Sequence, residues 1–446
     1  MKQFLLAVVA AAGIAACGSD SSLPVATGKG NVRAINGLPT SPEIDFRIEE
    51  RGLGSLTYKT ASTPSNWDDL DYLFNFDYRP PGVLVDPVRF ATEALTVKVD
   101  TVHTFLLWGD FSAPTITLWE WPERVFSDSD TVFELRVINS VVALGEIDVY
   151  FALDGVTPVL GEQVATLEPG EISDPMDYEG DTYITFVTPA GDPNTILYES
   201  PPAGIVARQS QLLTVFEGDA NDTAPVTARF FNNIGTSVSL PDVRFLPTRR
   251  FIHGTMNLET ADIYDDEAVT NRIYAGLAFG DATNDIEVAA GDVPITLTAE
   301  NNPGAILFEQ TYPVSSGSRV NTYMFWAEDA LRSSALAVDR RPVETEARIT
   351  WFQSSDNQQL VDLYLVDRGE TIDEALPRQV SLLRGFLAPP LRTVAGSYDI
   401  YITVAGEKTI LDGPLPIDLA LGDVVEAILL DRVDPALAEF RIIPPP

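Results

Sequence analysis

The sequence predicts an all-β protein in which four tandem immunoglobulin-like β-sandwich domains follow an export signal and a short flexible tether. Three observations support this fold class. Apolar and aromatic residues recur with the period of two that is typical of strands. The 30 Gly and 32 Pro residues divide the chain into short runs. One ordered set of landmarks occurs four times along the 446 residues.

The N-terminal residues 1–16 have the features of an export signal, with a positively charged start and an apolar run too short to span a bilayer. The segment Ile14–Cys17, Ile-Ala-Ala-Cys, resembles the lipobox of bacterial lipoproteins. That resemblance implies that Cys17 is acylated and becomes the mature N-terminus, where several acyl chains together anchor a protein stably to a membrane. An ordinary secretory signal that happens to contain a cysteine is the alternative.

The residues after the cysteine suggest a location. Gly18 and Ser19 follow Cys17, and the first acidic residue is Asp20. In Gram-negative lipoproteins an aspartate directly after the cysteine favours the inner membrane, so its absence implies the outer membrane. Residues 17–30 are rich in Gly and Ser and predict a flexible tether reaching roughly 20 Å. We therefore expect a lipid-anchored protein of the bacterial cell envelope.

Strand-like runs fill the rest of the chain. Tyr72–Tyr78 alternates aromatic residues with other types, and Ile184–Thr188 and Ile400–Val404 are rich in β-branched residues. The best helix candidate, Ala327–Val338, is short and lacks clear caps. The sequence therefore predicts strands throughout, with about seven in each domain.

The first landmark of the repeat is an opening strand of the form Arg-x-Ile-Asn followed by an aspartate in a second strand. In three units the aspartate comes nine residues after the fourth residue of the opening strand, and in the fourth unit two residues later. The pairs are Arg33–Asn36 with Asp45, Arg136–Asn139 with Asp148, Arg250–His253 with Asp262, and Arg348–Trp351 with Asp362.

Two further landmarks follow in the same order: a Gly-led turn into a Thr-containing strand in three units, and a closing apolar strand in all four. They predict four domains of about 100 residues. The expected boundaries are 31–125, 131–234, 242–339 and 345–446, with an aromatic insertion over 67–87 in the first domain.

These motifs resemble the bacterial domain-of-unknown-function family numbered 4397, and Arg136–Asp219 matches it most fully. The first unit departs by its insertion, and the fourth lacks Asn in the opening strand. The resemblance implies an exported, often lipid-anchored chain with the domain in tandem, and it implies no particular chemistry.

Composition excludes several classes of function. With 65 acidic and 29 basic residues the net charge is −36, which argues against nucleic acid as a partner. The single cysteine excludes a disulfide framework, a Cys-rich zinc site and an iron–sulfur cluster. The basic pairs Arg249-Arg250 and Arg340-Arg341 lie near unit junctions and predict contacts between domains or exposed strand starts, in preference to anion sites.

Acidic residues supply two candidate sites. The repeated aspartate could be a metal or ligand carboxylate. We favour a structural role, in which it lies on the polar face of its strand and accepts backbone N–H groups at a neighbouring turn. Calcium prefers several oxygen ligands, and the best candidate set is Glu217, Asp219 and Asp222. Otherwise no cofactor is expected.

Trp67 and Tyr72 lie among acidic residues, and aromatic rings beside carboxylates can stack on sugars, so glycan binding is one interpretation. The other is core, because Tyr72, Phe74, Phe76 and Tyr78 share one strand face. Trp119 and Trp121 share a face in the same way and are also expected in core.

No catalytic constellation emerges from the sequence. His103 and His253 lie in different units, no Gly-x-Ser-x-Gly motif occurs, and neither His has a partner at zinc-ligand spacing. The leading hypothesis is a non-enzymatic, lipid-anchored rod that acts as scaffold, spacer or adhesion surface. The alternative is a glycan- or protein-binding module that uses the aromatic insertion, and a hydrolase is the third class.

Overall fold

The computed structural model describes residues 25–82, 85–159 and 161–446. Throughout these residues the chain forms strands, turns and one 3₁₀ turn, Val142–Leu144, with no α-helix. The segment proposed as the best helix candidate contains strand β27 instead (Ala330–Leu336). The prediction of an all-β, multidomain sandwich protein is confirmed.

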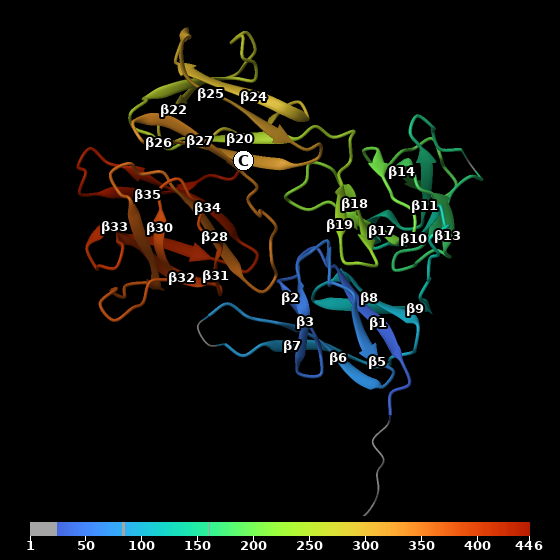
Figure 1. Ribbon diagram of the computed structural model, residues 1–446. Helices are drawn as coiled ribbons and strands as arrows, with labels where there is room; N and C mark the ends of the chain where they lie inside the picture. The colour runs from blue at the N-terminus through green and yellow to red at the C-terminus, as the bar shows by residue number, and fades with distance from the viewer. Residues whose placement is uncertain (1–24, 83–84, 160) are drawn as a thin grey trace, which may run out of the picture.

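The strands group into four units, which we name by their order along the chain (Figure 1). Unit 1 contains β1 (Lys29–Gly37), β2 (Ile44–Ile48), β3 (Arg51–Leu56), β4 (Thr60–Ala61), β5 (Ser65–Asp68), β6 (Asp71–Tyr78), β7 (Val88–Thr96), β8 (Thr101–Asp110) and β9 (Ala113–Pro122). Unit 2 contains β10 (Val132–Asn139), β11 (Ile147–Leu153), β12 (Ala165–Leu167), β13 (Met176–Glu179), β14 (Thr182–Pro189), β15 (Tyr198–Glu199), β16 (Ala203–Gly204), β17 (Ser210–Glu217), β18 (Val226–Asn232) and β19 (Ser237–Leu240).

Units 3 and 4 are more regular, with eight strands each among the described residues. Unit 3 contains β20 (Thr248–His253), β21 (Thr260–Tyr264), β22 (Arg272–Ala278), β23 (Ile286–Glu287), β24 (Gly291–Ala299), β25 (Asn302–Val314), β26 (Arg319–Ala327) and β27. Unit 4 contains β28 (Ala347–Gln353), β29 (Leu360–Asp367), β30 (Gln379–Leu383), β31 (Leu391–Thr393), β32 (Gly396–Val404), β33 (Ile410–Leu419), β34 (Val424–Asp431) and β35 (Ala438–Ile443).

Each unit consists of two sheets with the same topology. In one sheet the opening strand pairs in parallel with a strand near the end of the unit, as β1 does with β8, β10 with β17, β20 with β26 and β28 with β34. The other sheet is built on the second strand, which pairs antiparallel with a later one. Apolar side chains from both sheets fill a separate core in each unit.

The end of each opening strand explains the repeated Asn. The Oδ1 atoms of Asn36 and Asn139 accept the backbone N–H two residues on, at 3.0 Å in both cases. In unit 4 Gln353 does the same with Ser355 at 2.9 Å. Gln353, not Trp351, is therefore the equivalent residue, and Asp362 comes nine residues after it. The two extra residues expected in unit 4 came from a wrong alignment. Arg348 was aligned with Arg33 and Arg136, but the residue at their position, three before Gln353, is Thr350.

The repeated aspartate accepts backbone N–H groups as we expected in three units, but there it is buried and does not lie on a polar strand face. Asp148 accepts the N–H of Gly191 at 2.7 Å, Asp262 accepts that of Asn301 at 3.0 Å, and Asp362 accepts that of Gly406 at 2.8 Å. All three aspartates are buried. Each thus ties its own strand to the turn that follows the partner strand. Asp45, which is less buried, instead accepts the hydroxyl of Ser55.

The aromatic insertion of unit 1 is not an insertion. Its residues 71–78 form β6, which pairs with β2 as β14, β24 and β32 pair with the second strands of the other units. Phe74 and Phe76 are fully buried, as expected from the shared strand face. The aromatic composition of β6 differs from that of β14, β24 and β32, so its equivalence to them was not recognised from the sequence.

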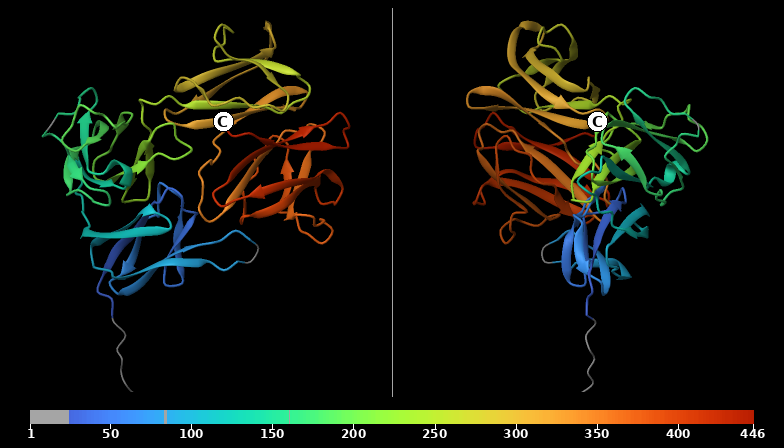
Figure 2. Two further views of the ribbon diagram at one scale, coloured as in Figure 1. Left: turned by 180° about the vertical axis from the view of Figure 1, so that it is seen from behind. Right: turned by 45° about the vertical axis from the view of Figure 1, so that its right-hand side comes forward.

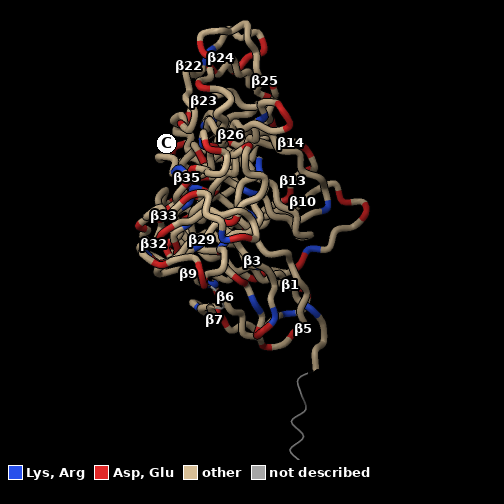
Figure 3. Tube along the Cα trace, turned by 90° about the vertical axis from the view of Figure 1, so that its left-hand side faces the viewer, with Lys and Arg blue, Asp and Glu red and all other residues tan. Residues whose placement is uncertain are grey.

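The expectation of a rod is also wrong. Units 1 and 2 pack through an apolar cluster that includes Ile35 and Leu212, and units 3 and 4 through one that includes Tyr323 and Phe352. Unit 4 then returns to unit 1, where Arg392 of β31 donates to Arg79 O at 2.7 Å. In the segment that leads into unit 4, Glu344 N–H also donates to Thr40 O at 3.1 Å. The four units therefore follow one another around a closed ring (Figures 1 and 2). Acidic residues are spread along the chain in all of them (Figure 3).

Candidate functional site

The acidic turn between β17 and β18, proposed as a calcium site, lies where unit 2 meets unit 1. Lys59 of unit 1 reaches into it, with Nζ 3.2 Å from Asp219 Oδ2 and in closer contact with Asp222. These side chains are largely buried, with exposures of 10%, 9% and 24%. Beside them Tyr58 donates its hydroxyl to Glu217 O at 2.7 Å, and burial raises the pKa of Tyr58, with Asp219 adding to the effect.

This geometry differs from the calcium expectation. Glu217 contributes its carbonyl oxygen to the junction while its side chain is exposed, and the carboxylates of Asp219 and Asp222 hold an ammonium group. Within the described residues no three Asp, Glu, His or Cys side chains gather as a metal site. Two of the predicted ligands, Asp219 and Asp222, therefore come together on Lys59, and the side chain of Glu217 does not join them.

The same turn continues into unit 3. Asn221 accepts the backbone N–H of Arg340 at 2.7 Å and donates its amide to Asp339 at 2.9 Å. Arg319 donates to the carbonyl of Asp222 at 2.9 Å. One turn of unit 2 is thus bonded to units 1 and 3, which makes it the junction of three units.

Arg341 closes the ring onto unit 1. Its guanidinium group donates to Pro39 O at 3.0 Å and to Ser41 O at 2.9 Å. The prediction that the basic pairs make contacts between domains is confirmed for Arg250, Arg340 and Arg341. It is wrong for Arg249, which is buried within unit 3 against the ring of Tyr312, with no hydrogen-bond partner in the described structure.

The two aromatic residues proposed as a glycan platform pack on each other. The rings of Trp67 and Tyr72 lie 5.9 Å apart in an edge-to-face arrangement, and both border the core of unit 1. Arg51 covers the indole of Trp67 at 5.1 Å. Stacking a sugar on this indole would require the displacement of Arg51.

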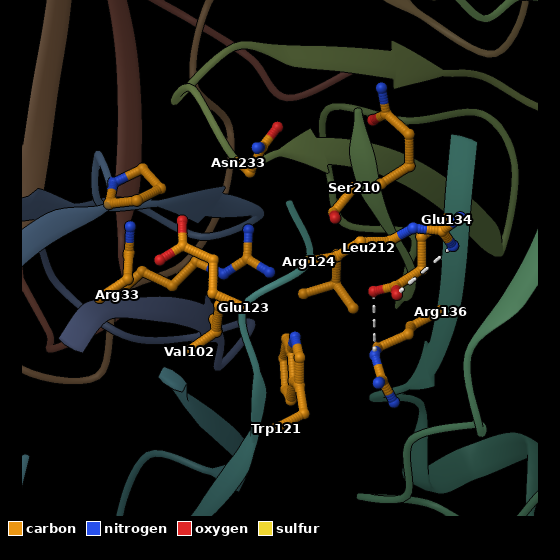
Figure 4. A pocket seen from close by; sticks show the side chains of 13 residues that line it. Arg33, Val102, Trp121, Glu123, Arg124, Glu134, Arg136, Ser210, Leu212 and Asn233 are labelled. Atoms are coloured by element: carbon orange, nitrogen blue, oxygen red, sulfur yellow. Dashed lines mark ion pairs between the residues drawn. The ribbon is translucent and has the colours of Figure 1, made fainter. Parts of the chain in front are cut away.

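A crevice between units 1 and 2 contains another tryptophan. Figure 4 shows Trp121 between the side chains of Val102 and Arg136. The guanidinium of Arg136 lies 4.7 Å from the centre of the Trp121 ring. Together these two side chains leave a cavity of only about 20 Å³, which is space for about one water molecule.

A wider groove runs along the outside of β9, beside the partly buried Trp119. It is an open hollow of about 520 Å³ whose other wall is the unit 2 segment 164–176, including Glu171, Ser173 and Asp174. An adjoining groove of about 570 Å³ shares Trp119 and Asp174. Trp121 is buried, as expected, whereas Trp119 borders open space and carboxylates.

Both histidines are fully buried in different units. Burial lowers the pKa of His103 and lowers the pKa of His253 to about 4. Nδ1 of His253 accepts the N–H of Thr255, so this histidine replaces the repeated Asn.

The sequence did not reveal that Lys59 binds the acidic turn or that Arg341 binds unit 1. Their partners lie 163 and 300 residues away, at Asp222 and Ser41. Such contacts leave no periodic pattern in a sequence. Cys17 lies outside the described residues, and no helix among the described residues has the length and hydropathy needed to cross a membrane.

Comparison with protein-family models and with curated proteins yields no match. Among solved structures, 14 chains match. The Bacillus anthracis TIE protein has 9% identity and a TM-score of 0.16, with 91% of this chain and 69% of that one covered. The product complex of the multi-modular glycogen-degrading pneumococcal virulence factor SpuA has 8% identity and a TM-score of 0.16, with 85% and 37% covered. TM-scores this low carry no argument about function.

Proposed function

We propose that this chain is a non-enzymatic, lipid-anchored protein of the bacterial cell envelope, related to the domain-of-unknown-function family numbered 4397. Cys17 would carry the lipid, and the four sandwiches would form one compact platform held beside the membrane by the tether. The lipobox resemblance supports the anchor, and the tandem Arg-x-Ile-Asn units support the family.

The observation that carries the proposal of a scaffold is the closed ring. Contacts at the acidic turn join units 1, 2 and 3, and the contact of Arg392 with Arg79 O joins unit 4 to unit 1. Arg341 and Glu344, in the segment between units 3 and 4, also bond to unit 1. A chain built to move its domains would leave their junctions open, since small polar interfaces favour relative motion. A closed ring instead presents its outer surfaces in a constant arrangement, which suits a scaffold.

Buried titratable groups support a role without catalysis. The aspartates of the repeat accept backbone N–H groups, and the junction carboxylates are paired with Lys59 and with arginines. The two histidines lie in separate units within strand cores. Each of these groups has a structural partner or a structural position.

Mass spectrometry of the mature protein tests the anchor. We expect an acylated Cys17 at the N-terminus, and the variant C17S should move from the membrane fraction to the soluble fraction of the envelope. An unmodified N-terminus at another residue would contradict the proposal.

A second candidate function is glycan binding, now at the groove beside Trp119 instead of at Trp67. A partly exposed indole next to Glu171, Ser173 and Asp174 offers the stacking surface and the hydrogen-bond acceptors that sugars require. A glycan array should lose its signal with W119A and retain it with W67A. If wild type and both variants bind no glycan, this function is excluded.

A further inference from the structure

A pocket between units 3 and 4 is the counterpart of the crevice in Figure 4, but it is open. The register of the parallel strands establishes the correspondence. Arg33 pairs with Thr104 and Arg250 with Asn321 at equivalent places, and Arg136 pairs with Leu212 as Thr350 pairs with Glu426. The two junctions therefore have the same architecture, although different side chains line them.

Two differences open the pocket. Trp121 pairs with Val102 in unit 1, and Val338 follows β27 at the equivalent place in unit 3. The stacked Trp121 and Arg136 of the first junction correspond to the much smaller Val338 and Thr350 of the second. The cavity consequently grows from about 20 Å³ to about 430 Å³.

The lining of this pocket divides into an apolar and a polar part. The apolar part includes Val338, Val424, Val425, Ile442, Ile443 and Pro445. The polar part includes Arg250, Arg319 and Arg340. Pockets of this volume with mostly apolar walls and a few convergent polar groups are the usual form of small-molecule sites.

Charge favours an anion in the polar part. Arg250 pairs with Glu426 at 2.9 Å, so these two charges offset each other. Arg319 and Arg340 share the one carboxylate of Asp285, so the three arginine side chains here outnumber the carboxylate side chains by one. Burial alone would raise the pKa of Asp285, but the two guanidinium groups hold it below its ordinary value. This excess is notable in a chain whose net charge is −36.

The pocket also contains a buried polar atom without a partner. The hydroxyl oxygen of Thr350, a residue with 2% exposure, has no hydrogen-bond partner in the described structure. Buried hydroxyl groups are normally bonded, because the loss of water otherwise costs free energy. This oxygen is closed to solvent, so a ligand in the pocket would reach it only after a shift of the neighbouring side chains.

From these observations we propose that the junction of units 3 and 4 binds a small amphipathic monocarboxylate. The carboxylate meets Arg319 and Arg340, and the apolar chain lies against Val338 and Ile443. The first junction binds no such molecule, because Trp121 and Arg136 fill the same space.

Calorimetric titration with octanoate and with octylammonium, which share a chain length and differ in charge, tests this site. We expect octanoate to bind the full chain with a Kd below about 1 mM, and octylammonium to bind at least about tenfold more weakly. Absence of octanoate binding, or equal binding of the two compounds, would overturn the proposal.

Two variants assign the binding to this pocket. V338W places at the second junction the residue that fills the first, and it should weaken octanoate binding at least about tenfold. If V338W binds octanoate with the same affinity as wild type, the binding site lies elsewhere in the protein. Should V338W fail to fold, R340Q provides the second test, because Arg319 still pairs with Asp285. R340Q should weaken octanoate about tenfold and should not weaken octylammonium, because it removes a repelling charge. Equal affinity of octanoate for R340Q and wild type would refute the role of the guanidinium group.

Discussion

The replacement of the repeated Asn by His253 should make unit 3 sensitive to acid. His253 is fully buried, Nδ1 accepts the N–H of Thr255, and Nε2 has no partner among the described residues. Burial lowers its pKa from 6.5 to about 4 in the folded state. Between these values the unfolded chain binds a proton that the folded chain does not, so stability falls as the pH decreases from 6.5 towards 4.

The size of the effect follows from the two pKa values. With 6.5 unfolded and about 4 folded, proton linkage predicts a loss of about 2 to 3 kcal/mol between pH 7 and pH 4.5. The variant H253N restores the side chain of Asn36 and Asn139, which accepts the same N–H and does not titrate. The stability difference between H253N and wild type should therefore grow by that amount as the pH is lowered.

Urea denaturation of both proteins at pH 7 and pH 4.5 measures this difference. His103 is present in both proteins, so its own titration cancels from the comparison. If H253N and wild type lose stability in parallel, then the buried neutral imidazole is not the cause of acid sensitivity, and the reasoning is refuted.

Three further substitutions test the structural account. K59M removes the ion-pair partner of the buried Asp219 and Asp222, and should lower the free energy of unfolding by about 3 kcal/mol in urea denaturation; an unchanged value would contradict the junction. R249M replaces a buried guanidinium without hydrogen-bond partners by an apolar side chain of similar length, and should raise the melting temperature; a lower one would show that the charge is stabilising. D362A removes the acceptor of the Ser381 and Gly406 N–H groups and should cost about 2 to 4 kcal/mol, against less than about 1 kcal/mol for D45A, which loses one hydroxyl contact. Equal losses would contradict the role of the repeated aspartate.

Much of the fold could be predicted because strands and turns leave local patterns. The period of two identified the aromatic face of β6, and the spacing between opening strand and aspartate revealed the repeat. The role of Asp148, Asp262 and Asp362 also followed from sequence, since a lone acidic residue between apolar neighbours in a strand needs nearby N–H groups.

The errors have physical causes. Arg348 imitated the start of the opening strand, and Gln353 performs the function of Asn with a longer side chain, so the register of unit 4 was shifted by two residues. Closure of the ring depends on contacts such as Arg341 with Ser41, which are 300 residues apart. The open pocket arises because Val338 and Thr350 are smaller than Trp121 and Arg136 at the first junction. This correspondence can be recognised only from the strand register, which aligns the two junctions.

The closed ring is the central claim, and small-angle X-ray scattering of residues 25–446 tests it directly. Four compact units of about 100 residues each have radii of gyration of about 13 Å, and a closed arrangement of four such units predicts about 27 Å for the whole. The same units in a line predict about 40 Å. A value near the first supports a single rigid platform, and a value near the second would contradict it.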